Sequence, residues 1–226
     1  MKLIQCQYNE LGYAVSPRLL SPTECDSLVQ EAHRIAGRDQ GSTRPLMQAH
    51  RNSNQFLGLL KDKRFVDLAK ALLESPVSAL QFHFYFAPPG QPGFVAHQDN
   101  FCIEGPPSSV VSFWVPFVDV TPENGGLYTY DKSHESALLP VIDIPPDRIH
   151  PLYKNMDKET DVSGLGTAVN VHLNKGDALI LHGENVHGSH SNKSDECRYS
   201  AVLTYIKRGV SFRPGFTAQR VEIEVP

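Results

Sequence analysis

Residues 77–86 read Val-Ser-Ala-Leu-Gln-Phe-His-Phe-Tyr-Phe, and they mark the point at which the sequence changes from helical to strand patterns. Successive side chains of a strand point to opposite faces, so Gln81, His83 and Tyr85 share one face and three phenylalanines share the other. The aromatic face predicts a core. In a barrel, the polar face is expected to look inward toward a site. The alternative for His83 is a histidine that only hydrogen-bonds within the sheet.

Further strand patterns follow along the second half of the chain, at residues 109–120, 127–130, 168–173, 178–182 and 199–206. The first two are separated by Glu-Asn-Gly-Gly at 123–126, which predicts a tight turn because Asn and Gly accept positive φ. We prefer this turn to a catalytic role for Glu123. A helical start followed by many antiparallel strands predicts a mainly β fold with flanking α-helices, a jelly roll or a related barrel.

The N-terminal part, residues 1–76, carries a short strand pattern at 11–15 and two helix patterns. Ser21-Pro22-Thr23-Glu24 places a serine at the cap, a proline at the first helical position and a glutamate three residues after the cap, which predicts a helix that ends at Gly37. A second helix is expected from about residue 62 to residue 74. Residues 38–55 are polar and without a clear period, so we expect a loop at the rim of a site.

Prolines and glycines between residues 131 and 167 predict a long loop, and a loop of this length is usually functional, for example as a lid. The chain has 226 residues and 40% hydrophobic composition, enough for one substantial core. We therefore expect a single domain over residues 1–226, with its β core at about 77–210.

Charge and cysteine content exclude several classes of protein. The net charge is −4 and the basic residues are scattered, so neither a nucleic acid nor a membrane surface is an expected partner. No apolar stretch resembles a signal peptide or a membrane span. The four cysteines lie far apart without a Cys-x-x-Cys pair, which favours free thiols in a reducing compartment. We expect a cytoplasmic protein.

The chemistry is concentrated in Phe94-Val95-Ala96-His97-Gln98-Asp99-Asn100. Side chains at i and i+2 of an extended segment point the same way, so His97 and Asp99 can bind one metal ion together. They supply two of the three ligands of the 2-His-1-carboxylate triad of non-haem Fe(II) oxygenases, and a distant histidine must supply the third.

Three histidines compete for that third position: His182, His187 and His190. His187 follows a strand and a turn, and it precedes Arg198 by 11 residues (198 − 187 = 11). One strand then presents a metal ligand and the next presents a guanidinium, which suits the far carboxylate of a cosubstrate bound to the metal. We prefer His187 and leave the other two as rim residues or alternatives.

Taken together, these motifs resemble the phytanoyl-CoA dioxygenase family of Fe(II)- and 2-oxoglutarate-dependent oxygenases. The resemblance covers about residues 77–206 and, more loosely, the N-terminal helices. It depends on the order of five elements: Phe84-Tyr85-Phe86-Ala87-Pro88-Pro89-Gly90, His97-Gln98-Asp99, Trp114, Glu123-Asn124-Gly125-Gly126-Leu127, and Gly176-Asp177 ahead of His187-Gly188-Ser189 with Asn192 and Arg198. It implies a double-stranded β-helix (cupin-like jelly roll).

The resemblance also implies a cofactor set of Fe(II), 2-oxoglutarate as cosubstrate and O2. His97, Asp99 and His187 would bind iron, and Arg198 would bind the distal carboxylate of 2-oxoglutarate. Ser189 would lie near that carboxylate and Trp114 beside the cosubstrate. The inward residues Gln81 and His83 are further candidates for contact with the bound molecules.

One feature of the motif bears on the reaction. Related halogenases have a small residue where this chain has Asp99, so the carboxylate favours hydroxylation, desaturation or ring chemistry. We expect a hydroxylase that acts on an aliphatic carbon of a small molecule and releases succinate and CO2. The alternative is a cupin-like barrel that only binds a ligand, or a metal-dependent dioxygenase without an oxo-acid cosubstrate.

Two departures from the family pattern concern the surroundings of the site. Tyr130-Asp131-Lys132-Ser133-His134 stands where the family often has Pro-Gly-Ser-His, and the chain is short. The shared motifs specify neither the substrate nor the oligomeric state, which is a monomer or a homodimer. The basic residues of the long loop hint at an anionic group on the substrate: Lys132, His134, Arg148, His150 and Lys154.

Overall fold

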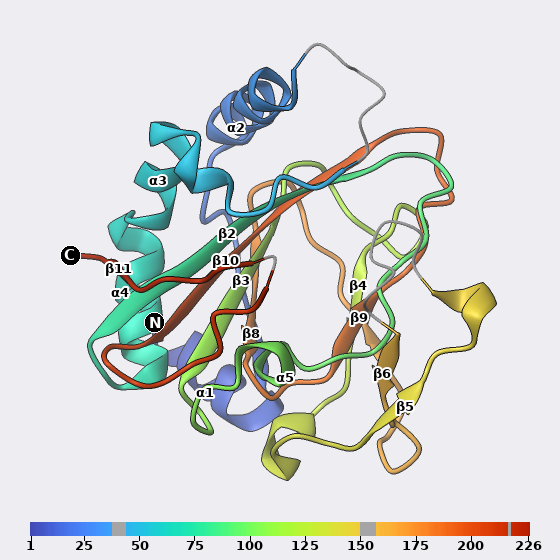
Figure 1. Cartoon of the computed structure of the whole chain (residues 1–226). Coiled ribbons are helices and arrows are strands. Elements are labelled where there is room, and N and C mark those ends of the chain that lie inside the picture. The colour runs from blue at the N-terminus through green and yellow to red at the C-terminus, as the bar shows by residue number, and fades with distance from the viewer. Residues whose placement is uncertain (38–43, 150–156, 217) are drawn as a thin grey trace.

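The computed structural model describes residues 1–37, 44–149, 157–216 and 218–226 (Figure 1). Its N-terminal part contains more helix than the sequence predicts. The elements are α1 (Lys2–Leu11), β1 (Tyr13–Ser16), α2 (Pro22–Ala36), the 3-10 turn η1 (Ala49–Arg51), α3 (Asn54–Leu60) and α4 (Lys63–Leu73).

Both predicted helices are confirmed, and their boundaries follow from local capping. The Ser21 side chain accepts a hydrogen bond from the Glu24 amide, and the Glu24 carboxylate accepts one from the Ser21 amide, which completes the capping box of α2. Asp62 is the N-cap of α4, and its carboxylate accepts a hydrogen bond from the Arg64 amide without the reciprocal bond of a capping box. The helices α1 and α3 were not predicted.

The strands form one large sheet and two small ones, and all of their pairings are antiparallel. The large sheet has the order β1-β8-β3-β10-β2-β11. Its remaining strands are β2 (Val77–Ala87), β3 (Val110–Pro116), β8 (Ala178–His182), β10 (Arg198–Lys207) and β11 (Ile223–Glu224). The second sheet has the order β7-β4-β9, from β4 (Leu127–Thr129), β7 (Val169–Asn170) and β9 (His187–Ser189). The two sheets confirm the predicted jelly roll.

The two faces of the large sheet differ as the alternation in residues 77–86 predicts. Phe82, Phe84 and Phe86 belong to the main core, which the N-terminal helices cover. Phe56 of α3 stacks on Phe82 with ring centres 4.7 Å apart. The opposite face carries polar side chains at alternate positions of β2, β3 and β10, and it is the face on which the site lies.

Residues 131–167 are less uniform than the single long loop predicted from the sequence. Their described parts contain the 3-10 turns η2 (Ser133–Ser136) and η3 (Pro146–Arg148) and the peripheral hairpin of β5 (Val141–Asp143) and β6 (Lys158–Thr160). The prolines do keep regular central strands out of this segment. The predicted loop at 38–55 ends earlier than expected, because η1 and α3 begin within it, and residues 38–43 lie outside the described part.

None of the helices in the described ranges is both long and apolar enough to pass through a membrane.

Candidate metal centre

The backbone brings His97 and His187 together before any side chain is considered. The His97 amide donates to the His187 carbonyl at 2.8 Å, and the His187 amide donates to the His97 carbonyl at 3.0 Å. The chain stays extended through Gln98, and the short helix α5 (Asp99–Ile103) then begins at Asp99. The extended segment predicted for residues 97–99 therefore ends one residue early, at Gln98. The side chains of His97 and Asp99 nevertheless both point toward His187.

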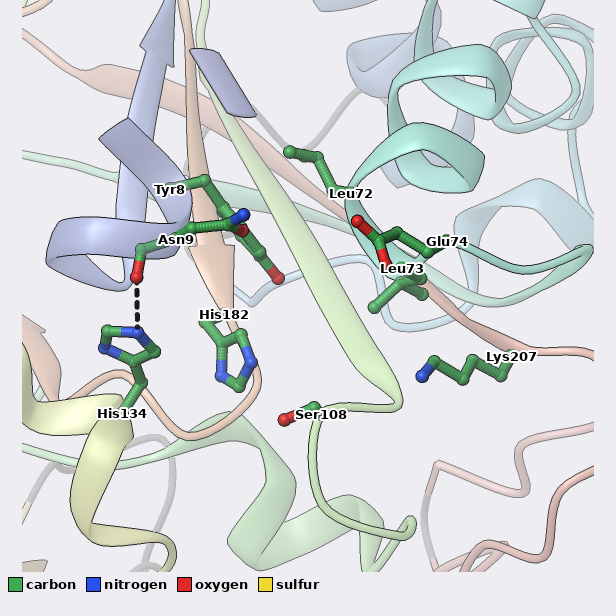
Figure 2. Close-up of a pocket in the computed structure, with 9 residues that line it drawn as sticks. All are labelled: Tyr8, Asn9, Leu72, Leu73, Glu74, Ser108, His134, His182 and Lys207. Atoms are coloured by element: carbon green, nitrogen blue, oxygen red, sulfur yellow. Dashed lines mark hydrogen bonds between the residues drawn. The ribbon is translucent and has the colours of Figure 1, made fainter. Parts of the chain in front are cut away.

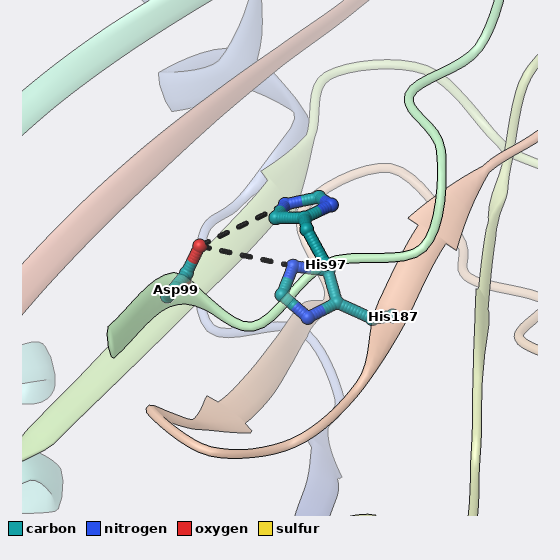
Figure 3. Close-up of side chains that lie close together, drawn as sticks. All are labelled: His97, Asp99 and His187. Carbon is teal, nitrogen blue, oxygen red and sulfur yellow. Dashed lines mark ion pairs between the residues drawn. The ribbon is translucent and has the colours of Figure 1, made fainter. Parts of the chain in front are cut away.

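Figure 3 shows the two imidazoles and the carboxylate pointing toward one another. Asp99 Oδ1 lies 3.8 Å from His97 Nε2 and 3.9 Å from His187 Nε2. Donor atoms bound about 2.1 Å from one metal ion lie about 3 Å apart when they subtend a right angle. A small inward movement therefore closes this group around a metal, and within the described residues it is the one cluster of its kind.

Both imidazoles are held with the same nitrogen toward the centre. Nδ1 of His97 lies 2.8 Å from the Val95 carbonyl, and Nδ1 of His187 lies 3.1 Å from the Asn185 carbonyl. A carbonyl only accepts, so Nδ1 carries a proton in each ring and Nε2 is the nitrogen that faces the centre and can bind a metal.

The residue between the first two ligands is fixed as well. Gln98 is buried, and its side-chain amide donates to the carbonyls of Ala137 and Glu184 at 2.7 Å and 2.6 Å. Its side-chain oxygen accepts from the Leu139 amide at 2.8 Å. Three bonds to two other segments hold the His-x-Asp stretch in place, a role that the sequence analysis missed.

The charge states suit a cation. Burial, followed by the nearby His97, lowers the pKa of His187 to about 4, so this imidazole is neutral at neutral pH. Burial by itself raises the pKa of Asp99. His187, His97 and a hydrogen bond from Ser112 lower it by more, so the pKa lies below the ordinary value of an aspartate. Neutral imidazoles and an ionised carboxylate are the forms that bind metal.

Arg198 and Trp114 lie next to each other on the same inner face. Arg198 is 6% exposed, its Nη1 donates to the Ser200 hydroxyl at 2.6 Å, and its guanidinium carbon is 5.4 Å from the centre of the Trp114 ring. Gly125 lies beside this guanidinium, where a Cβ would make an ordinary contact with Arg198 Nε at 3.5 Å, and its φ of 86° is the feature that favours glycine.

A family model described as phytanoyl-CoA dioxygenase matches residues 8–200. The chain belongs to the phytanoyl-CoA dioxygenase family. Phytanoyl-CoA dioxygenase domain-containing protein 1 of Danio rerio is 34% identical over 132 residues, which are 58% of this chain and 45% of that protein. Phytanoyl-CoA dioxygenase of Arabidopsis thaliana is 27% identical over 150 residues, 64% of this chain and 50% of that protein. The chain thus spans about half the length of these curated relatives.

Solved structures share the fold of this phytanoyl-CoA dioxygenase family member at low sequence identity. The epimerase SnoN, crystallised with Fe3+, alpha ketoglutarate and nogalamycin RO, has a TM-score of 0.78 and 22% identity, with 96% of this chain and 87% of that chain covered. EctD from S. alaskensis, crystallised with 2-oxoglutarate and 5-hydroxyectoine, has a TM-score of 0.72 and 20% identity, with 92% and 77% covered. Both agree with the jelly roll.

Three residues predicted to contact the bound molecules are engaged with protein groups in this family member. The Ser189 hydroxyl accepts from the Phe94 amide at 2.8 Å. Nδ1 of His83 accepts from the Gln48 amide at 3.1 Å, and Gln81 donates to the Thr204 hydroxyl at 3.2 Å. His83 and Gln81 do face inward, as predicted, and their contact with a cosubstrate stays a prediction.

The two alternative histidines lie apart from the triad of the family motif. His190 Nε2 is 2.7 Å from Asn170 Oδ1. His182 Nδ1 is 3.0 Å from Glu184 Oε2, and its ring lines a separate cavity of about 410 Å³ with His134 and Tyr8 (Figure 2). His134 thus lines this second cavity, and it belongs to the segment 130–134 that departs from the family pattern.

The basic residues of the long loop are used in different ways. His134 Nε2 is hydrogen-bonded to the Asn9 carbonyl at 3.3 Å, and Arg148 forms an ion pair with Glu159 at 3.0 Å. His150 and Lys154 lie outside the described residues. Besides Gln81 and His83, the buried side chain of Arg220 also faces inward. The sequence analysis did not predict it, because Arg220 follows the last predicted strand and belongs to no local pattern.

Proposed function

We propose that the protein is a non-haem Fe(II)- and 2-oxoglutarate-dependent oxygenase. As one oxygenase domain, it would hydroxylate an aliphatic carbon of a small-molecule metabolite or natural-product intermediate and release succinate and CO2. The observation that carries the proposal is the convergence of His97, Asp99 and His187, with free Nε2 lone pairs, on the inner face that also holds Arg198.

In this proposal each residue has one task. His97, Asp99 and His187 hold iron from one side and leave its other positions for cosubstrate and O2. Arg198 takes the distal carboxylate of 2-oxoglutarate, because its planar fork matches a carboxylate. Trp114 keeps that guanidinium oriented. Bound iron supplies the oxidising chemistry, and the protein supplies position and exclusion of water.

Family membership supports the proposed oxygenase function. So does the fold shared with proteins crystallised with Fe3+ or 2-oxoglutarate. The carboxylate of Asp99 occupies the place that halide would need, which favours hydroxylation over halogenation. Relatives named as an epimerase and a carbocyclase share the fold. The type of oxidation therefore has to be read from the product.

Anaerobic titration of the Fe(II)-loaded protein with 2-oxoglutarate tests the proposal. A weak visible charge-transfer band should appear as the cosubstrate chelates the iron. Arg198→Gln should weaken 2-oxoglutarate binding roughly 10- to 100-fold, the loss expected for a hydrogen bond between charged groups. Arg148→Gln, which changes a peripheral arginine paired with Glu159, is the matched control and should leave the titration unchanged.

Absence of the band from protein shown to hold Fe(II) would refute the oxygenase proposal. The cupin-like ligand-binding barrel, or a dioxygenase without an oxo-acid cosubstrate, would then take its place. Succinate formation distinguishes the proposed 2-oxoglutarate enzyme from both of these alternatives, since neither of them produces it.

A further inference from the structure

The C-terminal segment packs against α5, the helix that begins with the ligand Asp99. The Arg213 amide donates to the Ile103 carbonyl at 2.6 Å, and Arg220 Nη1 donates to the Cys102 carbonyl at 3.2 Å. The same Nη1 donates to the Arg213 carbonyl at 3.1 Å, which folds the segment onto itself. In Figure 1 the segment runs beside α5 before it ends as β11 on β2.

Arg220 is a buried cation on the inner side of this segment. It is 9% exposed, and its Nε donates to Gln81 Oε1 at 2.7 Å. Nε and Nη1 thus use three of the five guanidinium hydrogens. Among the described residues, no partner takes the two hydrogens on Nη2, and no carboxylate lies within ion-pair distance of Arg220.

A chain of hydrogen bonds runs from this guanidinium toward the metal ligand. Gln81 donates to the Thr204 hydroxyl, which lies 3.0 Å from the Ser112 hydroxyl. Ser112 is also one of the groups that lower the pKa of Asp99. Arg220 is therefore on the same polar face as the triad.

The two buried arginines of this face lie at different positions along β2, Arg220 beside the middle of the strand and Arg198 opposite its last residue. Gln81, the partner of Arg220, pairs with Thr204, whereas Arg198 pairs with Ala87. Six residues of extended strand separate the two positions, about 20 Å. Tyr85 lies between them: burial and the charge of Asp99 raise the pKa of its phenol, whereas Arg198 and Arg220 lower it.

We propose that Arg220 binds a carboxylate of the small-molecule substrate, so that the substrate is an organic acid. This inference rests on the proposed function: Arg198 holds 2-oxoglutarate at one end of the face, and Arg220 holds the substrate acid at the other. A buried cation needs a counter-charge. The carboxylate of Asp99 would be bound to the metal ion, so the counter-charge of Arg220 would have to come from another anion.

A carboxylate fits the remaining donors better than a phosphate does. The guanidinium carries one positive charge, which one carboxylate balances, and the N–H groups on Nη2 are the donors that its oxygens would meet. A phosphate dianion would need a second cation, and the nearest one, Arg213, is already paired with Glu104 at 2.9 Å. Arg213 is also about half exposed, so it serves as the matched control.

The test measures binding, not turnover. Anaerobic protein loaded with Fe(II) and 2-oxoglutarate is titrated calorimetrically with a panel of straight-chain and aromatic monocarboxylates, with the amide of each acid, and with inorganic phosphate. At least one acid should bind in the millimolar range or better, and its amide should bind at least tenfold more weakly. Arg220→Gln should weaken that acid at least tenfold, Arg220→Lys less, and Arg213→Gln should have no effect.

A purely structural role for Arg220 predicts a different pattern. Both Arg220 variants would then lose the bonds to Gln81 and Cys102 and would behave alike, whatever charge they carry. The charge-transfer band of the 2-oxoglutarate complex must persist in Arg220→Gln, which shows that the variant is folded and that the proposed function holds independently.

Several results would overturn the inference. These are equal binding of acid and amide, acid binding that does not depend on Arg220, no binding by any acid of the panel, or Arg220-dependent binding of phosphate in preference to the acids. If the band itself is absent from wild type, the proposed function fails first.

Discussion

At the scale of single residues, the site is a set of charge states that burial maintains. His187 and His83 lie against the inner face, where desolvation disfavours a proton on either ring. Arg198 and Arg220 are permanently charged, and each lies where an anionic group can meet it. Under the two proposals above, the centre would hold one metal cation and two anions.

Asp99→Ala should remove the single carboxylate of the triad. We expect Fe(II) affinity to fall by at least roughly tenfold, since loss of even a supporting partner of a metal ligand has that effect. Hydroxylase turnover should be abolished. Equilibrium dialysis of Fe(II) measures the first, with Asp161→Ala, the same change at a partly exposed aspartate outside the cluster, as control. A variant with full activity would disprove the triad.

The pH dependence of stability should include a contribution from His83. Burial, then the charge of Arg220, lowers its pKa from 6.5 to about 3, so the folded protein binds fewer protons here than the unfolded chain between these values. The stabilisation is therefore present above pH 6.5 and is lost as the pH falls toward 3. Urea unfolding of His83→Gln should show a flatter decline between pH 6.5 and 5 than wild type. Parallel declines would show that His83 does not contribute.

At the scale of secondary-structure elements, two segments have to approach closely for the ligands to meet. β9 carries His187, and the stretch before His97 runs alongside it. A Cβ placed on Gly93 would lie 1.9 Å from the Ser189 carbonyl oxygen, so this approach requires glycine. The contact is between backbones, and a side-chain rotation cannot relieve it.

Gly93→Ala should therefore push this stretch away from β9 and separate His97 from His187. We expect a stability loss of roughly 1–3 kcal/mol, as for overpacking of a tight site, together with weaker Fe(II) binding. Chemical unfolding and metal titration measure both effects. Gly164→Ala is the control, because a Cβ there meets nothing within 4 Å. Unchanged metal affinity in Gly93→Ala would show that the contact does not position the ligands.

The elements predicted correctly are those whose signal is local. The alternation at 77–86 and the capping box at Ser21 each depend on neighbouring residues, so the sequence carries them completely. The helices α1 and α3 were missed because α1 turns polar after Ile4 and buries only Tyr8, and because α3 is only seven residues long. Arg220 was missed for a different reason: its partner Gln81 is 139 residues away, and no local pattern records such a contact.

At the scale of the whole molecule, the jelly roll joins the metal centre to the core through one sheet. One face of the large sheet packs its phenylalanines against the helices. The opposite face turns its polar residues toward the triad. The order of the motifs identified this architecture and the family. A single domain and a cytoplasmic location stay predictions from the sequence.

Metal binding should stabilise the entire fold. A ligand that binds only the folded state adds about 2.7 kcal/mol at a concentration 100 times its dissociation constant. Anaerobic addition of Fe(II) should raise the urea midpoint of wild type, and it should leave that of Asp99→Ala nearly unchanged. Equal shifts in both proteins would place the stabilising metal elsewhere.

The backbone pair of His97 and His187 has a further consequence, for hydrogen exchange. Each amide is covered by the carbonyl of the other residue, so neither exchanges with solvent until the two segments separate. These two amides would therefore report the opening of the centre directly, in protein without any metal. Slow exchange at both would mean that the ligands are arranged before iron arrives, and that binding it requires little further ordering of the chain.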